Sequence, residues 1–458
     1  MSIAHIFHMS RNDSIKDFVP LSRIKTVGDK EVYKDTDYLI GYTFDEFKNK
    51  YPTIDATKIF FCNGLHKTYY YDEVNYVLFS LPLYGKAVHM ATDKPFDEFT
   101  NWLISEYISN LQNREYSIPI LALNDRMRME YFNILAENNM LDGLFKLFMQ
   151  VYTTSDYGCE AISHENMIKL FNSRSQEEKI KMNQEKNNAL KRYPDTLTVY
   201  RGEASKSTSH HDSWSWTLDI NTANFFATRF GRDDSKIVKG TVSKDCVDTY
   251  FREESECIIN PKNVADIEIT ELYGQSWLAT KMNPYIMKLY HKYRDILIKK
   301  YENSHEANSH DQVHSARVLC LALLLGSLHK LNHAEMTNLA TAIVYHDLGR
   351  VDDSEDDLHG KRGAEIFMKT RAASSINKKL VAFLVECHCL DDYVGNEIIQ
   401  TDFNDDERVH LLFNIIKDAD ALDRVRFGKY GLDMSYLRLS ESSKMTLVAR
   451  LFFDEVRL

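Results

Sequence analysis

The spacing of apolar residues changes along the chain and predicts where helices give way to strands. Over residues 123–192 apolar side chains recur three and four positions apart, as at Met129, Phe132 and Ala136, which predicts amphipathic helices. Ser175 and the glutamate three residues after it have the sequence of a capping box, so a polar helix is expected to begin there.

A strand-type pattern follows this helical region. Apolar and polar residues alternate over 197–201, and short apolar runs occupy 237–242 and 256–259, which predicts three strands. Apolar residues spaced over 223–230 predict a short helix between the first two strands. Past Gly274 the helical spacing returns and persists to the end of the chain.

The order of these patterns predicts a multidomain α+β protein. Strand-like runs at 59–61 and 77–79, rich in aromatic residues, place an α+β region of unknown role at 1–115. Helices followed by short strands define a second region at 116–274, and an all-α region fills 275–458. The aromatic cluster of the first region is expected to be core packing, with partner binding as the alternative.

Composition and charge are those of a globular protein without an extended nucleic-acid surface. The chain has 458 residues, 44% apolar and 27% charged, which is long for one domain. Its net charge of −11 argues against nucleic acid as a partner, because binding phosphates requires a basic surface. Seven cysteines, none in a CxxC pair, favour a reducing compartment.

The sequence also predicts no secretory signal and no membrane insertion. The N-terminus lacks a basic segment followed by an apolar core, so no secretory signal is expected. The most apolar run, 318–326, is far shorter than the roughly 20 residues that span a bilayer and predicts a buried helix. We therefore expect a cytoplasmic protein without a membrane partner.

An arginine, a Ser-x-Thr step and a Glu-x-Glu pair follow one another across the predicted strands: Arg201, Ser215 with Thr217, and Glu254 with Glu256. These are the groups needed to break the nicotinamide–ribose bond of NAD. A carboxylate stabilises the positive charge that develops on the sugar, and a guanidinium fits the pyrophosphate oxygens. A hydroxyl orients the carboxylate, and an acid two residues away shares its strand face and can deprotonate the acceptor.

In this order the residues resemble the Arg-Ser-Glu class of mono-ADP-ribosyltransferases, over about 120–272. The resemblance implies a split β-sandwich with a helical lobe, NAD as cofactor and a protein arginine as acceptor. It implies that Arg201 binds the phosphates, Ser215 orients, Glu256 stabilises the ribose and Glu254 selects arginine. Further candidate cofactor contacts, through a close backbone approach, a hydroxyl or ring stacking, are Gly202, Thr217, Tyr200, Trp216 and Phe226.

Two alternatives accompany this assignment. The run Ser-Trp-Ser-Trp-Thr allows Ser213 in place of Ser215, and we prefer Ser215 because the following helix lies at the family's spacing from Thr217. The structural alternative is that Arg201 pairs with a carboxylate and that both glutamates of the pair are solvated.

A second group of residues predicts a metal centre in the helical region. His314 lies on a predicted helix, His346 and Asp347 end the helix over 339–345, and Asp420 lies on a later helix. Imidazole and carboxylate bind mid-first-row divalent ions, which keep positions open for water and make it nucleophilic at neutral pH.

These four residues resemble the ligands of the HD phosphohydrolase superfamily, over about 285–430. The resemblance implies one ion of Mn, Fe, Mg, Ni or Zn on these four, and His359 and His388 stand where some members bind a second. Asp418 competes with Asp420, which we prefer because Ala-Asp-x-Leu is the commoner family form. The GYP signature of members that hydrolyse cyclic dinucleotides is absent, so that substrate is not expected.

Together the two resemblances predict an NAD-dependent protein arginine ADP-ribosyltransferase with a metal phosphodiesterase that cuts the ADP-ribose pyrophosphate and leaves phosphoribose. The pairing is similar to the SidE-type ubiquitin ligases. It implies a bacterial or phage effector or toxin, active in a host cytosol on ubiquitin or another host protein. One alternative is two independent activities, with the hydrolase acting on free nucleotides or reversing the modification. Another is a scaffold of decayed domains.

Overall fold

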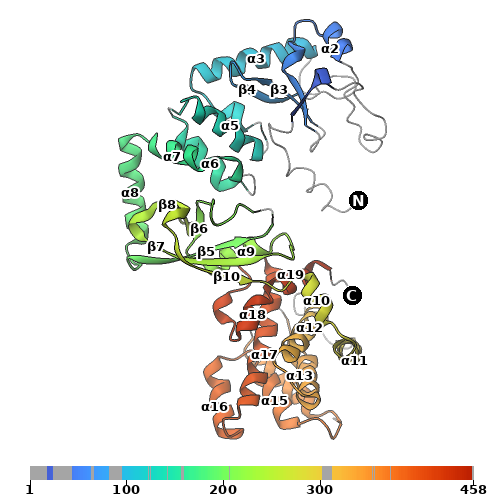
Figure 1. Cartoon of the computed structure of the whole chain (residues 1–458). Helices are drawn as coiled ribbons and strands as arrows, with labels where there is room; N and C mark the ends of the chain where they lie inside the picture. The colour runs from blue at the N-terminus through green and yellow to red at the C-terminus, as the bar shows by residue number, and fades with distance from the viewer. Residues whose placement is uncertain are drawn as a thin grey trace. The chain divides into compact units, whose positions relative to one another are not determined.

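The computed structural model, shown in Figure 1, describes most of the chain. The N-terminal stretch on which the expectation of no secretory signal rests lies outside the described residues. These are 18–23, 44–62, 67–81, 95–121, 123, 125–141, 143–155, 159–205, 207–301, 312–352, 354, 356–371 and 373–455.

Helices are combined with two antiparallel sheets, so the expected mixed α and β composition is present. The chain forms two compact units: residues 1–192 with 206–215, and residues 193–205 with 216–458. The boundaries expected near residues 115 and 274 stay predictions. Every described helix is too short or too polar to cross a lipid bilayer.

The first unit begins with a four-stranded sheet in the order β1-β2-β3-β4. Its strands are β1 (Phe18–Pro20), β2 (Ile59–Cys62), β3 (Lys67–Asp72) and β4 (Val77–Leu81). Tyr69 and Tyr70 are almost fully buried, and the ring of Tyr70 stacks on Phe79 at 5.2 Å. These aromatic side chains are therefore packed into a core, as expected.

Helices make up the rest of the first unit. They are α2 (Phe44–Lys50), α3 (Phe96–Gln112), α4 (Ser117–Leu121), α5 (Asp125–Glu137), α6 (Phe145–Thr154), α7 (His164–Asn172) and α8 (Gln176–Leu190). Met129, Phe132 and Ala136 are buried along α5, as their spacing predicted. The predicted capping box is confirmed, because the Ser175 hydroxyl accepts from Glu178 N at 3.1 Å and the Glu178 carboxylate accepts from Ser175 N at 2.8 Å.

The second sheet has six strands in the order β10-β7-β5-β6-β9-β8. They are β5 (Thr196–Glu203), β6 (Ser215–Thr217), β7 (Lys236–Ser243), β8 (Val247–Phe251), β9 (Glu256–Ile259) and β10 (Ala265–Glu271). All three strands expected in this region are confirmed. The helix expected over 223–230 is α9 (Ile220–Thr228).

Helix α9 packs directly on strand β5 at Gly202. A Cβ atom on this glycine would lie 2.1 Å from the carbonyl oxygen of Ala223 and 2.4 Å from the amide of Ala227. Both neighbours are backbone atoms of a helix, so neither can move away easily. Gly202 therefore allows close helix packing, and the space that we expected a ligand to use is filled by α9.

The helical part of the second unit surrounds one apolar helix. Its helices are α10 (Gln275–Lys281), α11 (Pro284–Tyr301), α12 (Gln312–Leu328), α13 (His333–Tyr345), α14 (His359–Met368), α15 (Lys378–Cys387), α16 (Asp392–Asp402), α17 (Glu407–Asp423), α18 (Ser440–Lys444) and α19 (Thr446–Glu455). Helix α12 is buried on all sides from His314 to Gly326, as its continuous apolar sequence predicted. It contacts α11, α13, α17 and α19.

The six-stranded sheet and these helices share one core. Ala223 and Ala227 of α9 belong to the same buried apolar cluster as Leu447 of α19. The Asn221 side chain donates to the Asp433 carboxylate at 3.1 Å and accepts from Met434 N at 2.7 Å. A polar contact therefore joins the start of α9 to the loop after α17.

Candidate functional site

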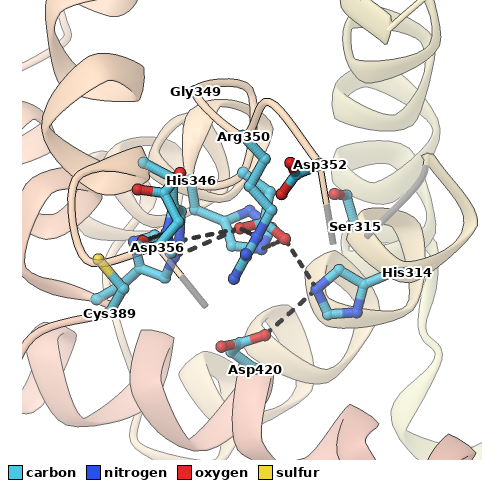
Figure 2. A network of polar contacts seen from close by, with 12 residues as sticks. His314, Ser315, His346, Gly349, Arg350, Asp352, Asp356, Cys389 and Asp420 are labelled. Atoms are coloured by element: carbon cyan, nitrogen blue, oxygen red, sulfur yellow. Dashed lines mark hydrogen bonds and ion pairs between the residues drawn. The ribbon is translucent and has the colours of Figure 1, made fainter. Parts of the chain in front are cut away.

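The six residues predicted as metal ligands converge in the helical part, and Figure 2 shows His314, His346 and Asp420 directed toward a common space. Each comes from a helix or a helix end. They are His314 on α12, His346 at the C-terminus of α13 with Asp347 after it, His359 at the start of α14, His388 at the C-terminus of α15, and Asp420 on α17. Except for Asp420, they are almost fully buried.

Asp347 is the centre of this cluster, with one carboxylate oxygen turned to each side. Its Oδ2 atom lies 3.4 Å from His314 Nε2 and 3.6 Å from His346 Nε2. Its Oδ1 atom lies 3.3 Å from His359 Nε2 and 3.7 Å from His388 Nε2. Asp420 Oδ1 lies 3.3 Å from His314 Nε2 on the first side. The cluster thus has two halves that share Asp347.

Three of the imidazoles have the same orientation, set by the backbone. His346 Nδ1 donates to Ile343 O and His388 Nδ1 donates to Val385 O, both at 2.7 Å, and His359 Nδ1 donates to Asp356 O. A carbonyl oxygen only accepts, so Nδ1 carries the hydrogen and a neutral ring has its lone pair on Nε2. These lone pairs face a carboxylate, an arrangement that is repulsive unless a cation or a proton lies between them. The residues therefore fit a divalent metal ion.

The fourth imidazole is fixed by a carboxylate that the sequence analysis missed. His314 Nδ1 lies 2.7 Å from Asp423 Oδ2. The fully buried Asp423 carboxylate also accepts from Arg317 Nε at 2.5 Å and from Arg426 at 3.0 Å. Asp423 follows Asp420 by three residues, and positions three apart share a helix face, so this spacing was the available signal.

The pKa values of three histidines differ in the cluster without a metal ion. Burial lowers the pKa of His346 to about 4, so its ring is neutral. Burial also lowers the pKa of His359, but hydrogen bonds with Asp347 and Cys389 outweigh it and raise the value to about 10. Burial opposes charge on His314 as well, yet its contacts with Asp347, Asp420 and Asp423 raise its pKa well above 6.5. Without a metal ion, protons on His314 and His359 therefore lie between these rings and the carboxylates, whereas His346 has no such proton.

A second residue that the sequence analysis missed lies beside His359 and His388. The ligand atoms of His359, His388 and Cys389 all lie within 4.8 Å of one another, and Cys389 is half-buried. The only sequence signal for it was its place directly after His388. Asp418, the competitor of Asp420, accepts instead from the amides of Arg438 and Leu439 at 2.9–3.0 Å.

A cleft of about 1080 Å³ opens onto this cluster, which is large enough for a nucleotide. His359, His388 and Asp420 are among the residues that line it. Three aromatic side chains with large exposed fractions also line it: Phe427 at 49%, Tyr430 at 78% and Tyr436 at 65%. Basic groups line it as well, namely Arg350, Lys417, Arg424 and Arg438.

The transferase-type residues lie on neighbouring strands of the six-stranded sheet. Strand β6 lies between β5, which carries Arg201, and β9, which begins at Glu256. Glu256 is buried, whereas the structural alternative required it to be solvated. Arg201 Nε lies 3.3 Å from Glu203 Oε1, and that pairing does match the alternative. Ser215 is the first residue of β6.

Other predicted residues of this group have partners of their own. Glu254 Oε1 lies 2.5 Å from Lys429 Nζ, on the loop after α17, so this acid is not simply solvated. The Thr217 hydroxyl donates to the backbone oxygen of Glu254 at 2.7 Å and accepts from Asp219 N at 3.0 Å. Thr217 therefore links the end of strand β6 to the turn before β9 by a hydrogen bond.

The aromatic residues proposed to stack on nicotinamide differ in exposure. Trp216 is 2% exposed, and this burial argues against the predicted stacking. Phe226 is half-buried, with the guanidinium of Arg229 4.5 Å from its ring centroid. Tyr200 packs partly against the shared apolar core. Phe226 is therefore the best placed of the three.

Comparison of the chain with models of protein families, with curated proteins and with solved structures found no match in any of the three. The resemblances to ADP-ribosyltransferases and to HD phosphohydrolases therefore stay predictions drawn from motifs. The evidence on function is therefore the geometry of the two groups of residues. More of the predicted residues lie close together in the helical cluster than in the strand group.

Proposed function

We propose that the helical part of the second unit is a metal-dependent phosphohydrolase with one divalent ion on each side of Asp347. The observation that carries this proposal is the set of four imidazole Nε2 atoms placed 3.3–3.7 Å from the Asp347 carboxylate. Among the described residues, His346 Nε2 is buried without a hydrogen-bond partner. Nitrogen and oxygen donors in this arrangement suit mid-first-row metals.

An ion bound there supplies Lewis acidity toward a phosphoryl oxygen and activates water at neutral pH. The chain's own groups then position the substrate. Arg350 donates to Asp347 Oδ1 at 3.0 Å, which holds its guanidinium at the cluster, where it can bind phosphate oxygens. The exposed rings of Tyr430 and Phe427 offer stacking surfaces for a nucleobase. The substrate class that fits is therefore a nucleotide ester or anhydride.

A second function is favoured by the order of the strands. Arg201, Ser215 and Glu256 lie on β5, β6 and β9, which are consecutive in the sheet. In an ADP-ribosyltransferase, Arg201 binds the pyrophosphate of NAD, Ser215 orients the acid and Glu256 stabilises the ribose cation. Glu254 directs an arginine acceptor. Binding NAD would exchange the contact of Arg201 with Glu203 for contacts with phosphate.

The two activities form a sequence in which the first makes the substrate of the second. Transfer from NAD to a protein arginine releases nicotinamide and leaves a pyrophosphate in the modification. Adding water across that pyrophosphate releases AMP and leaves phosphoribose on the protein. The alternative is a hydrolase that acts independently, on free nucleotides or in removing the modification.

Mass spectrometry of acceptor proteins tests the sequence of steps. The full chain is incubated with NAD, Mn²⁺ and candidate acceptors, ubiquitin included, and the added mass is read as ADP-ribose or phosphoribose. Glu256→Gln is expected to abolish both additions, and His346→Ala to leave ADP-ribose uncut. AMP release that persists in Glu256→Gln would refute the sequence, and metal-dependent hydrolysis of free nucleotides alone would favour the alternative.

A further inference from the structure

The two sides of Asp347 offer different donor atoms. On the Oδ2 side the neighbouring donors are the imidazoles of His314 and His346 with the carboxylate of Asp420. On the Oδ1 side they are the imidazoles of His359 and His388 with the sulfur of Cys389. The first set is nitrogen and oxygen, and the second adds a soft thiol.

Distances on the second side match ligands around one ion. For a tetrahedral zinc site, bond lengths of about 2.0–2.3 Å place nitrogen and oxygen donors about 3.3 Å apart and sulfur about 3.5 Å from nitrogen. His359 Nε2 and His388 Nε2 lie 3.0 Å apart. Asp347 Oδ1 lies 3.3 Å and 3.7 Å from these two atoms. The Cys389 sulfur lies within 4.8 Å of a ring nitrogen of each of these two histidines, so it is the remaining donor next to this side of Asp347.

Two further observations place the Cys389 sulfur at this position. Its contacts with Asp357 O and Glu386 O are both 3.7 Å long, and thiols are weak donors, so neither contact holds the sulfur away from the two imidazoles. A Cβ atom on Gly360 would lie 2.5 Å from Glu386 O, 2.8 Å from Val385 O and 2.9 Å from the sulfur. The missing side chain at Gly360 therefore lets α14 approach the end of α15 closely, which brings His359 beside His388 and Cys389.

We propose that Cys389 binds the second ion as a thiolate, so that His359, His388, Cys389 and Asp347 form a soft site beside the nitrogen- and oxygen-only site of His314, His346 and Asp420. This inference rests on the proposed metal centre. Thiolate favours Zn²⁺, Fe²⁺ or Co²⁺ over Mg²⁺ and Mn²⁺. The two ions consequently differ in kind, with the harder ion held by Asp420 and the softer one by Cys389.

Cobalt substitution tests the assignment without relying on activity. The full chain is freed of metal with a chelator and titrated with Co²⁺, while its absorption spectrum is recorded. Thiolate bound to Co²⁺ gives a near-ultraviolet charge-transfer band, whereas imidazole and carboxylate give only the weaker visible bands. We expect this band in the unaltered chain and its loss in Cys389→Ser. In that variant, Co²⁺ binding to the second site is expected to be weaker by about 10-fold or more.

Two control variants separate the sites. Cys246→Ser changes a half-buried cysteine of the strand-rich part and is expected to retain the band, as is His314→Ala, which alters only the first site. Bound Co²⁺ without the band, or a band that persists in Cys389→Ser, overturns the thiolate assignment and leaves the metal centre standing. No Co²⁺ binding at all overturns both proposals.

Alkylation of the unaltered chain covers the case in which Cys389→Ser does not fold. Modification of Cys389 by iodoacetamide is followed by mass spectrometry of its peptide, with and without Zn²⁺. The alkylation of a metal-bound sulfur is expected to be at least about tenfold slower, because the electron pair that attacks iodoacetamide is bound to the metal. Equal rates with and without Zn²⁺ would contradict the proposal.

Discussion

The helical cluster and the strand group differ in how their polar groups are satisfied. Around Asp347, buried imidazole nitrogens face a carboxylate at 3.3–3.7 Å. In the sheet, Arg201 pairs with Glu203, Glu254 pairs with Lys429, and Trp216 lies in the core. The predicted residues of the sheet thus have structural partners, whereas those of the helices point at one another.

This difference determines how strongly each site supports a function. Buried imidazole lone pairs that face a carboxylate are unfavourable unless a cation or a proton lies between them, and the lowered pKa of His346 leaves that ring without such a proton, which favours a cation there. An ion pair such as Arg201–Glu203 serves stability or ligand binding equally well. The metal centre is therefore the better supported proposal, and the following variants test that contrast, from the largest effect to the smallest.

Asp347→Asn is expected to have the largest effect. It weakens the carboxylate shared by both metal positions, and metal ions contribute several kcal/mol to the transition state, so metal-dependent hydrolysis should fall by about 10³-fold or more. The assay is hydrolysis of bis(p-nitrophenyl) phosphate with Mn²⁺ or Zn²⁺. Asp391→Asn changes an exposed acid that lines the same cleft and is the control, and equal losses in both variants would contradict a special role for Asp347.

Glu256→Gln is expected to slow ADP-ribose transfer by about 10²–10³-fold, the usual loss when charge stabilisation of a transition state is removed. Metal-dependent hydrolysis should be unchanged. Transfer is measured with labelled NAD and an arginine-rich acceptor. Glu253→Gln alters the exposed neighbouring acid and should have little effect. If both variants transfer equally well, the strand group is structural.

Asp423→Asn is expected to weaken metal binding at the His314 side by about 10- to 100-fold, because Asp423 fixes the orientation of that imidazole. The thiolate charge-transfer band of the Cys389 side should remain. Calorimetric titration of the metal-free chain measures the affinity. Asp405→Asn removes a comparable contact, with surface His410 at 2.8 Å, and serves as control. Unchanged affinity in Asp423→Asn would show that Asp423 acts only in packing.

Gly202→Ala is expected to lower the free energy of unfolding by about 1–3 kcal/mol through overpacking. The added carbon would meet the backbone of α9 at 2.1 Å. Gly240→Ala should cost less, because its closest neighbour is a methyl group of Val264. Urea denaturation measures both. If Gly202→Ala is as stable as the unaltered chain but does not use NAD, that result would support the prediction that a ligand contacts Gly202.

Asp392→Asn is expected to have the smallest effect, and one that depends on pH. Burial raises the pKa of Asp392, but hydrogen bonds from Arg438 and Lys417 outweigh it and lower the value below 3.8. A lowered pKa stabilises the fold above the unfolded value and ceases to do so as the pH falls through the folded one. The variant should thus lose at most about 1 kcal/mol at neutral pH. Urea denaturation at several pH values should show this difference shrinking below 3.8, and a difference that grows there would contradict the assignment.

Local patterns predicted much of the fold. Alternation predicted the strand β5, short apolar runs predicted β7 and β9, and the Ser175 capping box predicted the start of α8, because each of these signals depends on neighbours in the sequence. The candidate metal ligands were named from the resemblance to HD phosphohydrolases and from their place on helices, and the structure brings these six residues together. No local pattern shows that α9 fills the space at Gly202.

Contacts between distant segments could not be predicted. Lys429 and Glu254 are 175 positions apart, and no periodicity links them. Cys389 directly follows His388, and Asp423 stands three residues after Asp420, but this spacing alone does not show that folding brings each of them beside an imidazole. The Arg201–Glu203 pair is different, since residues two apart share a strand face and the sequence therefore contained the signal.

Counting the bound metal ions tests the central claim most directly. The full chain is saturated with Zn²⁺, freed of excess metal and analysed by mass spectrometry of its elements. If Asp347 joins two sites, about two equivalents should remain bound per chain, with about one in Cys389→Ser and almost none in Asp347→Ala. A chain that retains no metal after saturation would contradict the account.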